Sequence, residues 1–194
     1  NDATSISSGS LSSFMTDDTA ASACAVRYLL AHGHRSVSIV GGCANDTNSQ
    51  VGTRRLKGCR LALEEFGLPF NESRDYEPCC FSMEDGYRAA LSILKRKPDC
   101  TAVFALSDTI ALGAMRAARD LGRRCPEDIS IIGFDGIDAN KYTVPRLATI
   151  HQDADMLARK GVEDLLLRLQ YDRAAVNEVI PFTLREGESV KALS

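Results

Sequence analysis

The sequence predicts an α/β fold in which a parallel sheet is flanked by helices on both faces. Two observations support this class. Short apolar segments alternate with amphipathic helical segments along the chain, which is the pattern of parallel strands joined by right-handed helical crossovers. The segment TAVFALS at 101–107 is apolar almost throughout, as a strand buried on both faces requires.

The first half of the chain is predicted to contain two helices and two strands. Helices are expected over 18–33 and 51–67, because each of these segments ends on a glycine, a common stop signal at a helix C-terminus. The segment SVSIVGG at 36–42 is rich in β-branched residues and is expected to be a strand, with another near 74–81. The polar residues 1–13 are expected to be poorly ordered.

The second half continues the same alternation. Apolar residues recur at helical spacing around 87–94 and again around 110–121, where small residues would allow close packing on the sheet. The other expected elements, in chain order, are strands at 101–107, 129–135 and 147–153, a helix from Ala154 to about Gln170, and an extended stretch at 177–185.

The composition is that of an ordinary globular chain. The 194 residues are 44% hydrophobic and 25% charged, and no apolar run approaches the ~18–20 residues of a membrane span. The opening residues lack the charged-then-apolar order of a signal peptide. A net charge of −3 argues against nucleic-acid binding by this chain alone, because DNA-binding surfaces concentrate Lys and Arg.

The cysteines do not indicate a metal site or a disulfide framework. Their number is odd and no CxxC spacing occurs among them (Cys24, Cys43, Cys59, Cys79, Cys80, Cys100 and Cys125). Several lie in apolar runs, where a free thiol packs as a small hydrophobic group. We therefore expect a reducing cytoplasm, with a disulfide-bearing secreted protein as the alternative, and neither metal nor cofactor.

Four predicted strands end at residues suited to bind a ligand. Ligands of open α/β sheets bind beyond the carboxyl ends of the strands. The residues that follow those ends are Gly41 and Gly42 with the polar loop 43–49, then Phe81, then Ser107 with Asp108, and finally Phe134 with Asp135. Aromatic faces beside carboxylates suit a polyhydroxylated ring, and a purine or similar heterocycle would fit nearly as well.

Each of these residues also has a plainer structural role available. Asp108 suits an N-cap of the helix that follows it, Asp135 suits an Asp-Gly turn, and the phenylalanines suit the core. Arg54 and Arg55 are harder to explain, because the helix dipole disfavours cations in the first turns by roughly 0.3–1 kcal/mol. Their position indicates a partner, either an acidic side chain or a ligand.

The sequence gives no support for an enzyme. It contains no GxSxG elbow, no GK[ST] phosphate loop and no HExxH metal motif. Without a nucleophile–base pair or a metal set, we expect no catalysis.

Four ordered motifs resemble the lactose/galactose-repressor family of transcription regulators. They are AHGHRSVSIVGG, RRLKGCRLAL, FALSDTIALGAMRAARDLG and CPEDISIIGFDGIDANKYTVPRLATIHQD, and the resemblance runs from about Phe14 to the end of the chain. It implies a type I periplasmic-binding-protein-like effector domain with two lobes and a ligand held between them. In the family a helix-turn-helix head precedes this domain and binds an operator as a dimer.

The resemblance also implies which residues contact the effector. Arg55 matches an arginine that binds hydroxyls or ring substituents, and Asp135 matches the acidic contact of the GFD motif. Phe81, Ser107, Asp108, Ser49 and Gln152 match other positions around the family's cleft, and Phe134 beside Asp135 completes the candidate site. The effector class stays open between a sugar and a nucleobase-like molecule.

The expected organisation has three parts. A leading segment at 1–16 precedes the C-terminal lobe at 17–150, and 151–194 contains a crossing segment, a helix returning to the first lobe and a final strand. The DNA-binding head and the first lobe's opening strands are expected before Asn1, so weak effector affinity is expected for this chain alone.

The expected partners are a small-molecule effector, operator DNA through that head, and a second copy of the chain, with no membrane. The segment near Tyr142 is a candidate for the homodimer contact. A periplasmic sugar-binding protein of a transporter is the alternative function, which the seven cysteines and the opening residues disfavour.

Overall fold

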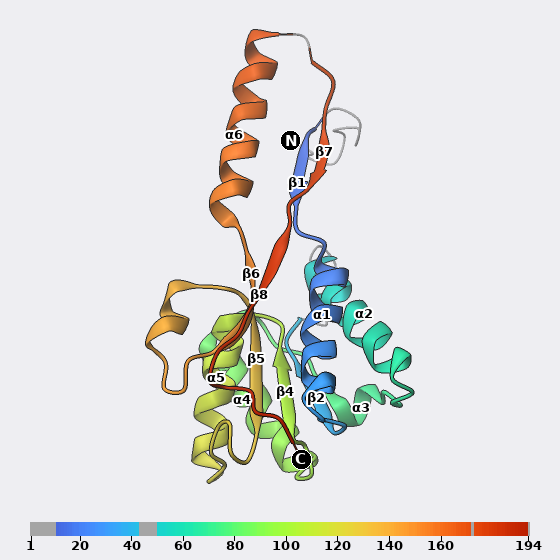
Figure 1. Cartoon of the computed structure of the whole chain (residues 1–194), viewed down its shortest axis with the longest axis vertical. Coiled ribbons are helices and arrows are strands. Elements are labelled where there is room, and N and C mark those ends of the chain that lie inside the picture. Colours follow the sequence, from blue (N-terminus) through green and yellow to red (C-terminus); the bar gives the residue numbers. More distant parts are fainter. Residues whose placement is uncertain (1–10, 43–49, 172, 194) are drawn as a thin grey trace. The chain divides into compact units, whose positions relative to one another are not determined.

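The structure of the protein is a computed structural model that describes residues 11–42, 50–171 and 173–193 (Figure 1). The chain divides into two compact units. The first comprises Asn1–Asp17 and Gln152–Phe182, and the second comprises Asp18–His151 and Thr183–Ser194. The large sheet and most of the candidate site belong to the second unit.

The second unit is built on a six-stranded sheet with strand order β3-β2-β4-β5-β6-β8. The four strand pairs from β3 to β6 are all parallel. The strands are β2 (Val37–Val40), β3 (Tyr76–Glu77), β4 (Ala102–Ala105), β5 (Ser130–Asp135), β6 (Ala148–Gln152) and β8 (Phe182–Arg185). The helices are α1 (Asp18–Ala31), α2 (Gln50–Glu65), α3 (Glu72–Asp75), α4 (Met83–Arg96) and α5 (Asp108–Asp120), with a 3-10 helix at Asp138–Tyr142.

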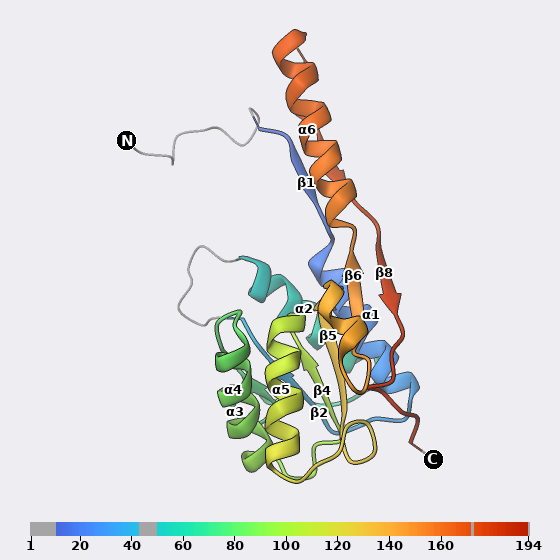
Figure 2. The same cartoon turned by 90° about the vertical axis from the view of Figure 1, so that its left-hand side faces the viewer.

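Helices cover both faces of this sheet. The α4 and α5 helices lie side by side on one face, and α1 and α2 pack together on the other (Figures 1 and 2). Every residue of β4 is buried, and in β5 all but Asp135 are buried, as expected for strands covered on both sides. These observations confirm the predicted α/β class with a parallel sheet between helical layers.

The first unit contains β1 (Ser13–Met15), α6 (Ala154–Gln170) and β7 (Asn177–Val179). The β1 and β7 strands pair in parallel, with Ser13 opposite Asn177. The α6 helix has the predicted bounds, and several of its apolar side chains are more than half exposed (Val162, Leu165, Leu166 and Leu169). Among the described residues, no helix is both long enough and apolar enough to span a membrane.

Two of the predicted strands differ from the structure, and proline explains both differences. The segment predicted as a strand near 74–81 is instead α3 followed by the two-residue strand β3, because Pro78 has no N–H to continue the ladder. The stretch at 177–185 is split at Pro181 into β7 and β8, which belong to different sheets.

Two shorter segments were also not predicted correctly. Residues 1–10 lie outside the described residues, but the expected disorder of 1–13 is wrong at Ser13, which begins β1. The 3-10 helix at Asp138–Tyr142 was not predicted at all.

Candidate ligand-binding site

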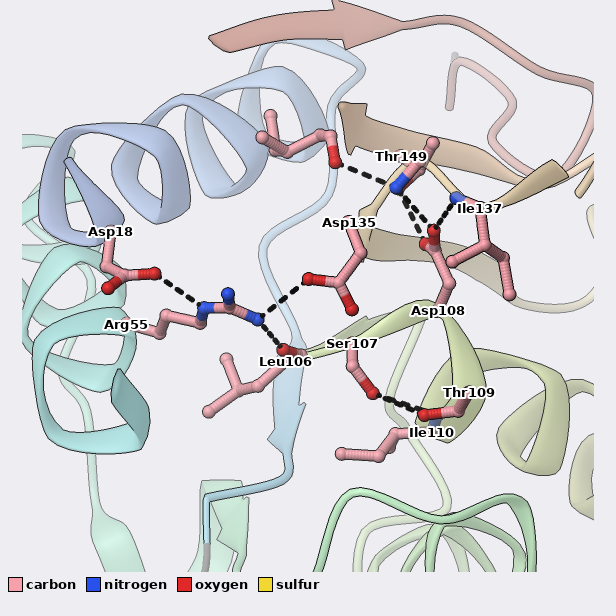
Figure 3. Close-up of polar contacts among 12 residues, drawn as sticks. Asp18, Arg55, Leu106, Ser107, Asp108, Thr109, Ile110, Asp135, Ile137 and Thr149 are labelled. Carbon is pink, nitrogen blue, oxygen red and sulfur yellow. Dashed lines mark hydrogen bonds and ion pairs between the residues drawn. The ribbon is translucent and has the colours of Figure 1, made fainter. Parts of the chain in front are cut away.

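Arg55 is the centre of a buried polar cluster at the carboxyl edge of the sheet (Figure 3). Its Nε donates to Asp18 Oδ1 at 2.8 Å, and its Nη1 donates to the Leu106 carbonyl oxygen at 2.5 Å. The same Nη1 lies 3.4 Å from Asp135 Oδ1. The Arg55 side chain is only 6% exposed, so these contacts replace most of its hydration. The cluster therefore joins α1, α2, β5 and the segment that follows β4.

Phe134 forms the floor beneath the guanidinium. The Arg55 Cζ atom lies 3.6 Å from the centroid of the Phe134 ring, which is fully buried. A cation over an aromatic face is attracted by the ring quadrupole, and the attraction is stronger when water is excluded. Phe134 was predicted as a ligand contact, but its burial favours a supporting role beneath Arg55.

Asp18 is the acidic partner that the position of Arg54 and Arg55 indicated. It is the first residue of α1, where a negative charge is favoured by the helix dipole. Its Oδ1 accepts from Arg55, and its Oδ2 accepts from Arg54 Nε at 3.2 Å. Sequence reasoning left the partner open and did not single out Asp18, which lies 37 residues before Arg55. The sequence did contain a signal for this ion pair, because an acidic residue begins one predicted helix and two arginines lie near the start of the next.

Asp135 is placed at the rim by an unusual backbone conformation. Its φ of 115° and the φ of 78° at Gly136 put two consecutive residues in the left-handed region. The Asp135 side chain is 31% exposed, against 6% for Arg55, so part of this side chain is accessible from the solvent side. Asp135 thus contacts a buried cation while keeping surface that a ligand hydroxyl or N–H group can reach.

Ser107 and Asp108 have distinct structural roles. Ser107 is the N-cap of α5, and its Oγ accepts from the Ile110 backbone N–H at 3.2 Å. The alternative that Asp108 caps this helix is therefore wrong. Asp108 is fully buried and accepts hydrogen bonds from Gly136, Ile137 and Thr149. Burial raises the pKa of Asp108, and these hydrogen bonds oppose that effect without cancelling it.

The remaining predicted contacts are not part of this cluster. Phe81 lies between β3 and α4, its side chain is 41% exposed, and it makes none of the Arg55 contacts described above. Gln152 ends β6 and belongs to the first unit. Ser49 lies outside the described residues. The structure thus brings Arg55, Asp135 and Phe134 together beside Ser107 and Asp108, and the ligand roles of Phe81, Gln152 and Ser49 stay predictions.

Residues 11–42, 50–171 and 173–193 contain no group of three or more His, Cys, Asp or Glu side chains placed to hold a metal ion. The histidines that share a loop have other contacts: His32 Nδ1 lies 2.8 Å from the Tyr28 carbonyl oxygen, and His34 lies between Thr101 and the Lys191 carbonyl. Burial lowers the pKa of His34, which keeps this ring neutral near pH 7. The polar contacts described for the Arg55 cluster are ion pairs and hydrogen bonds.

A parallel sheet between two helical layers defines an α/β domain, and its polar cluster lies at the carboxyl edge, where ligands of open α/β sheets bind. Residues 26–190 match the family described as periplasmic binding protein-like domain. The chain belongs to this family, and the predicted resemblance to regulators of the lactose/galactose-repressor type is confirmed by the relatives and solved structures that follow.

The similar proteins include repressors and solved regulator structures. The chain is 38% identical over 159 residues to the HTH-type transcriptional repressor PurR of Pasteurella multocida (strain Pm70), covering 81% of this chain and 46% of that protein. It is also 38% identical over 147 residues to PurR of Escherichia coli O1:K1 / APEC, covering 74% of this chain and 41% of that protein. The chain thus spans less than half the length of these curated relatives.

Solved structures show the same architecture. A LacI family transcriptional regulator from Enterococcus faecium with bound ribose has a TM-score of 0.86 and 29% identity, covering 94% of this chain and 67% of that one. The transcriptional regulator CelR in complex with cellobiose has a TM-score of 0.87 and 28% identity, covering 93% and 54% respectively.

Proposed function

We propose that this chain is the ligand-sensing domain of a DNA-binding transcriptional repressor, in which a bound small molecule controls operator binding. The observation that supports this most directly is the Arg55–Asp135 pair at the carboxyl edge of the parallel sheet, where ligands of such folds bind. Relatives that are named transcriptional repressors support a regulator over a transporter component. The described site consists of ion pairs to Arg55 and of buried residues that pack beneath them. This arrangement favours ligand binding over catalysis.

The proposed effector is a sugar. Asp135 has a partly exposed side chain whose carboxylate can accept from ring hydroxyls, and Arg55 fixes the position of that carboxylate. Phe81, Gln152 and Ser49 are proposed as further contacts from other segments, whereas Phe134, Ser107 and Asp108 support the site from beneath. Related regulators are described with ribose and with cellobiose, which favours the sugar, while the PurR relatives keep a nucleobase as the second candidate.

Control of DNA binding would follow from differential affinity. A ligand shifts a two-state protein only as far as it binds one state more tightly than the other. In the full-length protein the effector would favour one arrangement of the domain and thereby change how the DNA-binding heads are presented. The acidic net charge of this chain fits a sensing part that leaves DNA contacts to another segment.

A homodimer through the second unit is part of the proposal, as is a cytoplasmic location. The segment after β5 projects two apolar side chains into solvent, since Tyr142 is 83% exposed and Val144 is 93% exposed. Tyrosine is enriched at protein–protein interfaces, which makes this segment a candidate for the dimer contact. Replacing both with aspartate is expected to shift the full-length protein from dimer to monomer in sedimentation analysis.

The ligand proposal is tested by thermal shift of the full-length protein with ribose, cellobiose, hypoxanthine and guanine. A ligand present at 100 times its Kd stabilises the folded state by about 2.7 kcal/mol, which raises the Tm by several degrees. Asp135→Asn should abolish the shift, whereas Asp138→Asn should retain it, because Asp138 is exposed and pairs only with Lys141 among the described residues. A shift that survives Asp135→Asn would contradict the proposed site.

A further inference from the structure

Both oxygens of the Asp108 carboxylate accept hydrogen bonds. One oxygen accepts from the turn that follows Asp135, and the other accepts from the neighbouring strand β6. Its Oδ2 accepts from the backbone N–H groups of Gly136 at 2.6 Å and Ile137 at 2.9 Å. Its Oδ1 accepts from the Thr149 hydroxyl at 2.6 Å. One buried side chain at the start of α5 thus fixes the backbone directly after Asp135 and ties it to β6 (Figure 3).

The turn needs this support because its conformation is costly. A non-glycine residue in the left-handed region is strained and persists only where the surroundings enforce it. Asp135 adopts this conformation, and the two amides that follow it are those that Asp108 binds. Hydrogen bonds from N–H groups to a carboxylate are roughly twice as strong as neutral ones.

Two glycines lie in close contact with this turn and with the Asp108 carboxylate. A Cβ added at Gly133 would lie 2.2 Å from Asp108 Oδ1, and a Cβ added at Gly136 would lie 2.4 Å from His151 Nδ1. Gly133 therefore makes space for the Asp108 carboxylate, and Gly136 makes space for His151 beside the turn. Asp108 is fully buried and Thr149 is 2% exposed, so neither side chain is placed to touch a ligand.

We propose that Asp108 and Thr149 are positioning residues, which hold the turn at 135–137 so that the Asp135 carboxylate faces Arg55 at the rim. They would set the geometry of the acidic contact without contacting the ligand themselves. This differs from the contact role that the family resemblance implied for Asp108. The inference rests on the proposed function for its consequence, ligand affinity, but the network itself is testable without any ligand.

The first experiment follows amide hydrogen exchange by NMR in the chain without ligand. Thr149→Val removes the hydroxyl and keeps the side-chain shape, so exchange at Gly136 and Ile137 should accelerate about 10-fold beyond any change in global stability. Thr149→Ser retains the hydroxyl and should restore protection. Thr101→Val is the matched control, because the Thr101 hydroxyl is hydrogen-bonded at the amino end of the sheet, to His34.

The second experiment titrates the full-length variants with ribose and cellobiose. For a sugar that the wild type binds, Thr149→Val should weaken affinity about 10-fold, and Thr149→Ser should return it to near the wild-type value. Equal exchange at Gly136 in Thr149→Val and Thr101→Val would overturn the positioning role, as would unchanged affinity despite faster exchange. If the wild type binds neither sugar, the sugar proposal fails, and the exchange measurement still decides whether Asp108 and Thr149 hold the turn.

Discussion

At the scale of single residues, Arg55 shows how a buried charge is compensated in the second unit. It has a carboxylate at 2.8 Å, a carbonyl oxygen at 2.5 Å and an aromatic ring beneath it. Removing one partner of a buried ion pair typically costs 3–5 kcal/mol, because the other charge is left without compensation. The arrangement also needs a planar group with several donors, which lysine does not provide.

We therefore expect Arg55→Lys to destabilise the chain by about 2–4 kcal/mol, because one ammonium cannot reach Asp18 and the Leu106 carbonyl together. Arg54→Lys is the control on the same helix. Arg54 contacts Asp18 at 3.2 Å, but its side chain is 39% exposed. The loss of stability in Arg54→Lys should therefore stay below about 1 kcal/mol. Urea denaturation of both variants measures the difference, and equal losses would contradict the buried role of Arg55.

The sequence indicated which edge of the sheet holds the site, but not which side chains reach solvent there. Arg55 and Asp135 were each predicted as effector contacts, and Arg55 Nη1 lies 3.4 Å from Asp135 Oδ1. Asp108 and Phe134 lie near the same strand ends, yet both are fully buried. Strand order determines where a residue lies along the sheet, whereas the left-handed turn at Asp135 decides which side chains point outward, and no local pattern announces that turn.

At the scale of elements, glycines set how closely the helices approach each other. A Cβ added at Gly113 of α5 would lie 2.2 Å from the Met83 carbonyl oxygen and 2.5 Å from the Tyr87 nitrogen of α4. On the other face, a Cβ added at Gly58 of α2 would lie 2.2 Å from the Thr19 carbonyl oxygen of α1. Backbone atoms cannot swing aside as side chains do, so these positions admit only glycine.

The same substitution should therefore have opposite effects in two helices. Gly113→Ala is expected to destabilise the chain by about 1–3 kcal/mol, because α4 and α5 must move apart. Gly161→Ala in α6 is expected to stabilise it by up to about 1 kcal/mol, because nothing lies within 4 Å of the added Cβ and alanine is the better helix former. Thermal melting followed by circular dichroism measures the direction of the Tm change in each variant. A higher Tm for Gly113→Ala would refute the close packing of α4 and α5.

Helices were predicted more accurately than the short strands, for a physical reason. Helix ends carry local signals, such as the Ser107 cap of α5 and the left-handed glycines at 33 and 67. A strand is defined by a partner that lies far away in the sequence. The pairing of Ser13 with Asn177 could not be read from either segment alone, and three-residue strands offer too little alternation to be recognised.

At the scale of the whole molecule, a buried ion pair fastens the outer strand of the sheet. The Lys97 Nζ lies 2.8 Å from Asp75 Oδ1 and donates to the Val37 carbonyl oxygen at 2.9 Å. The two side chains are 6% and 3% exposed. Arg74 and the backbone N–H of Asn71 also donate to Asp75, so the end of α3 and Lys97, which follows α4, meet at one carboxylate. Lys97 in turn connects this carboxylate to the start of β2.

This cluster predicts a specific loss of stability in acid. Burial by itself raises the pKa of Asp75, but the hydrogen bonds from Arg74, Lys97 and Asn71 outweigh it and lower the pKa to about 2. A lowered folded-state pKa means that the stabilisation is fully present above the ordinary value of 3.8 and is lost as the pH falls towards 2. The shift corresponds to about 2 kcal/mol.

Asp75→Asn should therefore be less stable than the wild type at pH 7, because Lys97 stays buried without a carboxylate, and the difference should shrink by about 2 kcal/mol between pH 4 and pH 2. Denaturant midpoints across this range measure the change. Asp155→Asn, at an exposed position in the first turn of α6, should track the wild type within about 0.5 kcal/mol. A constant difference between Asp75→Asn and the wild type down to pH 2 would mean that Asp75 holds no proton-linked stability, and the fastening of β3 would then depend on apolar packing alone.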